Sequence, residues 1–137
     1  MIDPRFLSVE EVLSLHADQL ERYGGSEGVR DRGALESAVE TPRATFDGEL
    51  LHDGLFAIAA AYAFHIAESQ AFVDGNKRAA LNAALVFMLL NGWVVVDPDE
   101  KLYDAMIAIS ARTMSKTELG ELLKQLAVPD PEEEGAF

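Results

Sequence analysis

Two apolar stretches decide the fold of this chain: GLFAIAAAYAFHIAE at residues 54–68 and GNKRAALNAALVFMLL at residues 75–90. Each is long enough for about four turns of helix, and the frequent alanines let neighbouring helices approach closely. Apolar residues occur on every side of both segments, which is typical of buried helices. The longest unbroken apolar run, residues 55–64, is too short to cross a bilayer. We therefore expect these two helices to form the centre of a helical protein.

Helix-capping signals place two further helices before this pair. Ser8 is followed three residues later by Glu11, and such a capping box predicts a helix that ends near Gly24. Asp31 is expected to cap a shorter helix. Pro42 ends that helix, because the residue before a proline avoids helical dihedrals.

Similar signals mark the helices of the second half. Asp53 is expected to cap the helix over residues 54–68, and Pro98 to occupy the first position of a fifth helix. Ser115 and Glu118 form another capping box, which opens a last helix through about residue 127. The sequence thus predicts an all-α fold of about six helices.

Three segments have no helical pattern. Residues 41–51 contain proline, glycine and the isolated Phe46, and we expect an exposed loop or short flap there. Residues 93–96 are β-branched and extended, but we expect them to be too isolated to form a sheet. From Pro129 onward the chain is acidic, and this tail is expected to fray.

Composition excludes several classes of function. The chain has 137 residues, of which 24 are acidic and 11 basic, giving a net charge of −13. This charge argues against nucleic-acid binding and against a polybasic membrane patch. The absence of cysteine excludes disulfides, thiolate zinc sites and a cysteine nucleophile. The first eight residues do not resemble a secretory signal. We therefore expect one soluble, cytoplasmic domain.

Polar residues gather between the two apolar helices, in QAFVDGNKR at residues 70–78. Gly75 permits a ligand to approach the backbone, and the helix that begins there presents free N–H groups to an anion. Lys77 and Arg78 add positive charge, and Asp74 offers a hard oxygen ligand of the kind that Mg²⁺ prefers. Together these features suggest a site for nucleotide phosphates with Mg²⁺.

A plainer interpretation of the same residues is open. Asp74 would then be only a helix cap, and Asn76, Lys77 and Arg78 a solvated first turn. Helix caps are common and phosphate sites are rare, so composition alone favours this interpretation.

Residues 70–78 resemble the signature of the Fic/Doc family, which is H-x-F-x-D-G-N-K-R in its death-on-curing branch. Eight of the nine positions are compatible here. Asp74 and Lys77 favour the death-on-curing branch over the AMP-transferring branch, which usually has glycine where Lys77 stands. The resemblance extends over about residues 6–126, and the further matching segments are LH at 15–16, RYGG at 22–25, GVRD at 28–31, LESAV at 35–39, ALNAALVF at 80–87 and NG at 91–92.

The resemblance implies a compact Fic-type helical bundle over residues 1–127, without significant sheet, followed by an acidic tail at 128–137. It also implies a role for each residue of the loop. Asp74 would bind Mg²⁺, and the backbone at Gly75 and Asn76, together with the Asn76 side chain, would hold phosphate oxygens. Lys77 and Arg78 would neutralise phosphate charge, and Phe72 would anchor the loop in the core. The stretch near Thr45 and Phe46 would be a flap that aligns the target.

The activity implied is transfer of a phosphate or nucleotidyl group from ATP, or another nucleotide, with Mg²⁺. In the death-on-curing branch the toxin is a kinase that phosphorylates a threonine of elongation factor Tu and halts translation. A cognate antitoxin neutralises it. The resemblance therefore implies elongation factor Tu and an antitoxin as partners, no direct contact with nucleic acid or membrane, and a monomer outside the antitoxin complex.

One position departs from the family: Gln70 stands where the family has its catalytic histidine. A glutamine amide can orient a hydroxyl but cannot take its proton, and loss of a general base typically costs about 10²–10⁴ in rate. We therefore predict that the chain binds nucleotide but transfers slowly or not at all. A non-catalytic module that binds nucleotide or a partner, and a helical structural domain with neither role, remain alternatives. Gln70 is compatible with both a natural residue and an inactivating substitution.

The three histidines are not expected to replace the missing base. His65 lies five residues before Gln70 and is interpreted as a packing histidine. His16 is interpreted as structural, and His52 is expected to be solvated beside the predicted flap.

Overall fold

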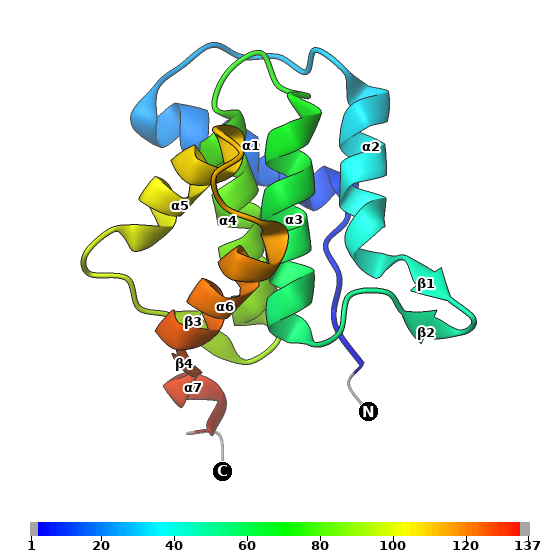
Figure 1. The fold of residues 1–137 in the computed structure, drawn as a ribbon. Helices are drawn as coiled ribbons and strands as arrows, with labels where there is room; N and C mark the ends of the chain where they lie inside the picture. Colours follow the sequence, from blue (N-terminus) through cyan, green and yellow to red (C-terminus); the bar gives the residue numbers. More distant parts are fainter. Residues whose placement is uncertain (1–2, 135–137) are drawn as a thin grey trace.

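The computed structural model describes residues 3–134 and confirms the all-α prediction, with six helices of nine or more residues in that range. In chain order the elements are α1 (Val9–Tyr23), α2 (Arg32–Glu40), the 3₁₀ turn η1 (Thr41–Arg43), β1 (Thr45–Phe46), β2 (Glu49–Leu50), α3 (Leu55–Ser69), α4 (Asn76–Leu90), β3 (Trp93–Val95), α5 (Lys101–Ser110), α6 (Lys116–Leu126), β4 (Ala127–Pro129) and α7 (Pro131–Glu134) (Figure 1).

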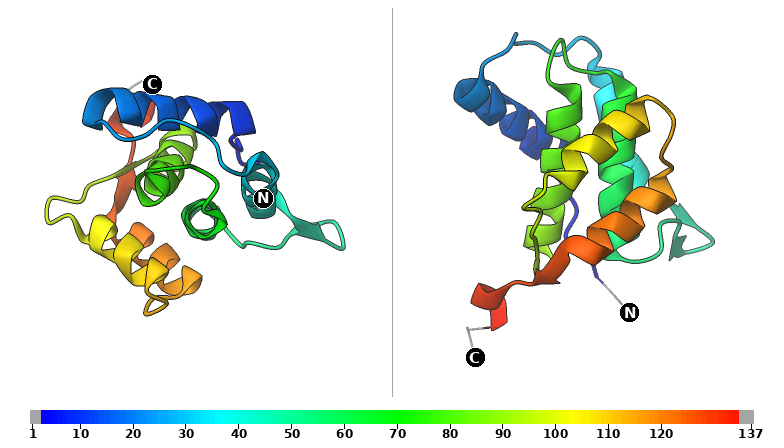
Figure 2. Two further views of the ribbon diagram at one scale, coloured as in Figure 1. Left: turned by 90° about the horizontal axis from the view of Figure 1, so that it is seen from above. Right: turned by 60° about the vertical axis from the view of Figure 1, so that its left-hand side comes forward.

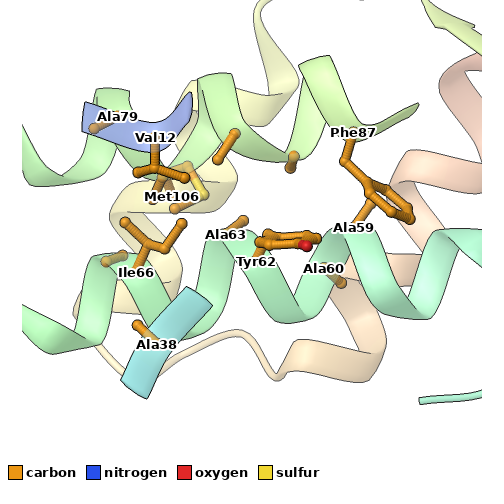
Figure 3. Packing of buried hydrophobic residues seen from close by; sticks show 14 of the residues in the cluster. Val12, Ala38, Ala59, Ala60, Tyr62, Ala63, Ile66, Ala79, Phe87 and Met106 are labelled. Atoms are coloured by element: carbon orange, nitrogen blue, oxygen red, sulfur yellow. The ribbon is translucent and has the colours of Figure 1, made fainter. Parts of the chain in front are cut away.

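Helices α3 and α4 pack against each other at the centre, as predicted (Figures 1 and 2). Helix α1 packs on α4 and α2 packs on α3, while α5 and α6 cover the opposite side of the pair. Figure 3 shows side chains from five helices, including Val12, Ala38 and Met106, meeting around the alanines of α3 and α4. Within residues 3–134, no helix has both the length and the apolar character needed to cross a bilayer.

The core combines small residues on the central helices with a few large ones. Tyr62 and Phe87 are fully buried and their rings lie 5.2 Å apart. The Tyr62 hydroxyl accepts a hydrogen bond from the Leu7 backbone N–H at 2.8 Å, and burial raises the pKa of Tyr62 to about 12. The expected burial of α4 on all sides is wrong, because Leu85 is only half-buried and Leu89 is 50% exposed.

Three of the predicted caps are confirmed. Ser8 and Ser115 each accept from the backbone N–H three residues on, and the glutamate at that position bonds back to the serine N–H. The Asp31 carboxylate accepts from the Ala34 N–H at 3.0 Å. These local bonds need only neighbouring residues, which explains why the sequence alone predicted them.

Two helix starts differ from the prediction. Gly54, rather than Asp53, precedes α3, because its φ of 94° interrupts the helical backbone there. Helix α5 begins at Lys101 instead of Pro98. The Asp97 carboxylate accepts from the N–H groups of Lys101 and Leu102, each at 2.9 Å, so it caps the helix across an intervening turn.

The prediction that residues 93–96 are too isolated to form a sheet is wrong. Strand β3 pairs antiparallel with β4, with Trp93 opposite Pro129 and Val94 opposite Val128. Strand β4 thereby crosses the boundary predicted at residue 127, and residues 131–134 form a helical turn. The expectation of a fray from Pro129 on extends to residues 135–137, which lie outside the described residues. With only two short strand pairs in the described part of the chain, the prediction of no significant sheet is confirmed.

Candidate functional site

Residues 70–75, here called the motif loop, join the central helices α3 and α4. Ala71 and Phe72 are fully buried and fix the loop to the core. The Asn76 side chain closes the loop, because its Oδ1 accepts from the Phe72 N–H and its Nδ2 donates to the Phe72 carbonyl, both at 2.9 Å. This geometry gives the Asn76 side chain a role in shaping the loop, and the role in phosphate binding that the resemblance implies stays a prediction.

Two buried polar side chains of helix α1 contact the motif loop. His16 donates from Nε2 to the Asp74 carbonyl at 2.8 Å, and its ring stacks on Phe72 with centroids 3.8 Å apart. Gln19 donates to the Gly75 carbonyl at 3.4 Å. Gly75 has a φ of 77°, and a Cβ there would collide with the Gln19 amide. The structural role predicted for His16 is confirmed.

The α1–α2 loop, residues 24–31, runs along the motif loop and pairs with it through the backbone. Val29 forms a β-bridge with Phe72, and the N–H groups of Arg30 and Asp31 both donate to the Ala71 carbonyl, at 2.7 and 3.1 Å. The Arg30 guanidinium also donates to the Gln70 carbonyl at 2.7 Å. Sequence reasoning noted GVRD in this segment as part of the resemblance but assigned it no role.

A polar cavity of about 450 Å³ lies where α1, the motif loop and the start of α4 meet, and we call it the anion cavity. The α4 backbone begins here without a side-chain cap, so its first N–H groups remain available to a ligand. Lys77 is exposed, and the Arg78 guanidinium lies over the rings of Tyr23 and Tyr103, at 4.7 and 5.9 Å from their centroids. The lining residues are Gln19, Leu20, Tyr23, Gly24, Gln70, Val73, Asp74, Gly75, Asn76, Lys77, Arg78 and Tyr103.

Asp74 is the carboxylate of the anion cavity. Its Oδ1 accepts from the Gly75 N–H at 2.9 Å and its Oδ2 from the Ser26 N–H at 3.1 Å, which fix the exposed carboxylate and leave each oxygen a further lone pair. A Cβ on Gly25 would lie 2.9 Å from Oδ2, so this glycine keeps the space beside the carboxylate free. No cluster of three metal-ligating side chains occurs among the described residues. One carboxylate beside a candidate phosphate site fits Mg²⁺ that arrives with a nucleotide.

Gln70 borders the anion cavity at the end of α3. Its backbone is left-handed, with φ 50° and ψ 35°, and its side chain donates to the Ala67 carbonyl at 3.0 Å. Such a backbone is uncommon for a residue other than glycine. The bonds from Gln70 to Ala67 and from Arg30 to the Gln70 carbonyl hold it in place.

The other two histidines lie together, away from the motif loop. The Nε2 atoms of His52 and His65 are 3.0 and 3.1 Å from the Lys116 Nζ. Burial and the Lys116 charge lower the pKa of His65 to about 4, and the same causes lower the pKa of His52. The packing role predicted for His65 is confirmed. The prediction of a solvated His52 is wrong, since it is half-buried and its Nδ1 is buried without a partner in the described residues.

The hairpin of β1 and β2 does not line the motif loop. It precedes α3, whereas Gln70 follows α3, and that helix of 15 residues is about 22 Å long (Figure 1). Phe46 is 75% exposed at the hairpin. The expectation of an exposed segment is met, while its role as a flap that aligns the target stays a prediction. His52, just after the hairpin, meets the later part of α3, because its ring centroid lies 6.2 Å from that of His65. The segment that lies beside the motif loop is the α1–α2 loop.

Comparison with known proteins identifies the family of this chain. The sequence profile of the Fic/DOC family matches residues 6–88, which include α1, the α1–α2 loop and the motif loop. "Protein kinase doc" of Escherichia phage P1 is 35% identical over 122 residues, covering 89% of this chain and 95% of that protein. "Toxin Doc" of Mycolicibacterium smegmatis is 44% identical over 70 residues, covering 51% of this chain and 54% of that protein. The chain belongs to the Fic/DOC family.

Proposed function

We propose that this chain is a Doc-type toxin that binds a Mg²⁺-nucleotide in the anion cavity and presents its phosphate to a hydroxyl of a target protein. The observation that carries the proposal is the uncapped start of α4, with Lys77 and Arg78 beside it, on a loop fixed from two sides. Phosphoryl transfer depends mainly on positioning and on charge stabilisation, and this arrangement supplies both.

The donor nucleotide, ATP or a related nucleotide, would place its phosphates over the first turn of α4. The N–H groups and the helix dipole attract the anion, and Lys77 and Arg78 offset its charge. The Arg78 guanidinium already contacts two tyrosine rings, so little side-chain entropy is lost when it meets a phosphate. Asp74 would hold Mg²⁺, which supplies neutralisation of phosphate charge when bound.

Gln70 sets the rate of transfer that we expect from this site. Its amide can donate to or accept from the target hydroxyl, but it does not titrate near neutral pH. The site would therefore align the acceptor without removing its proton, and transfer would be slow or absent. Because nucleotide binding does not use residue 70 as a base, a non-catalytic module that binds nucleotide or a partner is the second candidate, and the Gln70 side chain is the observation that favours it.

The relative named as a protein kinase suggests a protein as the target. We propose elongation factor Tu as that target, in the cytoplasm, with a cognate antitoxin as the controlling partner and a monomer outside that complex. The transferred group is a phosphate or a nucleotidyl group. In this proposal the Fic/Doc unit spans residues 1–127, and residues 128–137 form an acidic tail.

The test compares the chain with its Gln70→His variant, each incubated with labelled ATP, Mg²⁺ and elongation factor Tu. We expect the histidine variant to label the factor about 10²–10⁴ times faster. Calorimetry with Mg²⁺-ATP runs in parallel, and both forms should bind. Rapid labelling by the Gln70 form would refute the loss of the base. Nucleotide binding without labelling by either form would support the binding module instead.

A further inference from the structure

We propose that a second cavity, on the other side of Gln70, receives the protein segment that carries the acceptor hydroxyl. This cavity of about 540 Å³ lies between the end of α3, the end of α5 and the start of α6, and we call it the acceptor cavity. Figure 2 shows the turn between α5 and α6 beside α3. The inference rests on the proposed function, because it assigns a place to the second substrate of that reaction.

Gln70 is the residue that both cavities share among the described residues that line them. A donor in the anion cavity and an acceptor in the second cavity would therefore meet at position 70. In the transfer, the acceptor oxygen bonds to the terminal phosphorus of ATP while the bond from that phosphorus to the bridging oxygen breaks, releasing ADP. The hydroxyl proton goes to solvent in this chain, or to the imidazole of a Gln70→His variant. In this reaction the attacking oxygen of the acceptor and the leaving oxygen of ADP lie on opposite sides of the reacting phosphorus.

Charge separates the two cavities. Lys77 and Arg78 outnumber the single carboxylate in the anion cavity, whereas Glu68 and Glu118 outnumber Arg112 in the acceptor cavity. The first cavity therefore attracts phosphates more strongly than the second. The carboxylates of the acceptor cavity instead suit a segment with a basic side chain near its hydroxyl.

The nucleoside also fits better on the anion side. Tyr23 is 68% exposed and Tyr103 is 43% exposed, so both offer a ring face beside Arg78 on which a base can stack. A nucleotide bound in this way leaves the acceptor cavity free. Phe64, Ile109 and Met114 give that cavity an apolar lining, which suits an apolar side chain of an extended segment.

The test uses the Gln70→His form with ATP and elongation factor Tu as probes. Glu68→Lys reverses a charge of the acceptor cavity, and Met114→Trp fills it. Glu36→Lys is the matched control, because Glu36 is exposed on α2 and lines neither cavity. We expect both cavity variants to raise KM for the factor about tenfold while KM for ATP stays within about twofold. Melting temperatures check that each variant folds.

The two KM values show what occupies the acceptor cavity. A rise in KM for ATP would make this cavity a nucleoside site, and no change in either KM would leave it without a role in transfer; both overturn the inference. If the histidine form labels nothing, the proposed function fails, and the inference is judged by cross-linking. A photoreactive side chain at position 114 should then capture elongation factor Tu, and one at Leu89, on the far end of α4, should not. Absence of capture at 114 overturns the inference.

Discussion

The starts of α4 and α6 are built from similar parts but differ in what they leave open. Each first turn carries cations: Lys77 and Arg78 on α4, and Lys116 on α6. At α6 the capping box of Ser115 and Glu118 uses the N–H groups of these two residues. Lys116 is held by His52 and His65. At α4 a glycine precedes the helix and supplies no side-chain cap. A helix start therefore becomes a candidate anion site only where its caps and its cations are not already used within the protein.

The largest effect expected from this comparison is on nucleotide binding. Arg78→Ala should weaken Mg²⁺-ATP binding about 100-fold, because a charge-assisted bond to phosphate is lost. Lys116→Ala, the matching change at α6, should leave the affinity unchanged. Calorimetry on both variants checks this. Equal affinities for Arg78→Ala and the unaltered chain would place the phosphates elsewhere.

A second variant addresses the support from α1. His16→Phe keeps the stack on Phe72 but removes the bond to the Asp74 carbonyl. We expect Mg²⁺-ATP binding to weaken about tenfold, since a loop that opens more often is less preorganised. Hydrogen exchange at Val73 and Gly75 should accelerate at the same time. Unchanged exchange together with unchanged affinity would show that the bond from His16 does not fix the loop.

At the α6 cap we expect an effect on stability but none on nucleotide binding. Ser115→Ala removes the side-chain acceptor for the Glu118 N–H and should lower the free energy of unfolding by about 1 kcal/mol. Nucleotide affinity should not change. Denaturant unfolding and calorimetry on the same variant measure the two effects, and a loss of affinity would mean that the two helix starts are coupled.

The last prediction concerns the pH dependence of stability from the histidine pair, an effect confined to acidic conditions. His65 has a pKa of about 4 in the folded chain and about 6.5 when unfolded. The unfolded chain therefore binds more protons between these values, and stability contributed by the neutral imidazole is present above pH 6.5 and lost as pH falls toward 4. Unfolding midpoints measured across this range should fall less steeply in His65→Gln. Parallel profiles for the two proteins would contradict this assignment.

The sequence predicted what depends on neighbouring residues and missed what depends on distant ones. The caps at Ser8, Asp31 and Ser115, and the polar loop between two apolar helices, follow from local chemistry. The bond from Ser26 to Asp74 joins residues 48 positions apart, and the bond from Lys116 to His52 spans 64. No periodicity signals such contacts. The family resemblance located the loop, but the structure was needed to find its support from α1 and the α1–α2 loop.

The placement of Trp93 decides what intrinsic fluorescence can observe in this protein. It is the single tryptophan of the sequence, and the centroid of its ring lies 5.3 Å from that of Phe56. It pairs with Pro129 in the antiparallel strand pair of β3 and β4. Helix α4 separates it from the anion cavity by about 22 Å. Tryptophan emission will therefore follow the separation of β3 and β4 during denaturation. A nucleotide titration will need a reporter near the anion cavity.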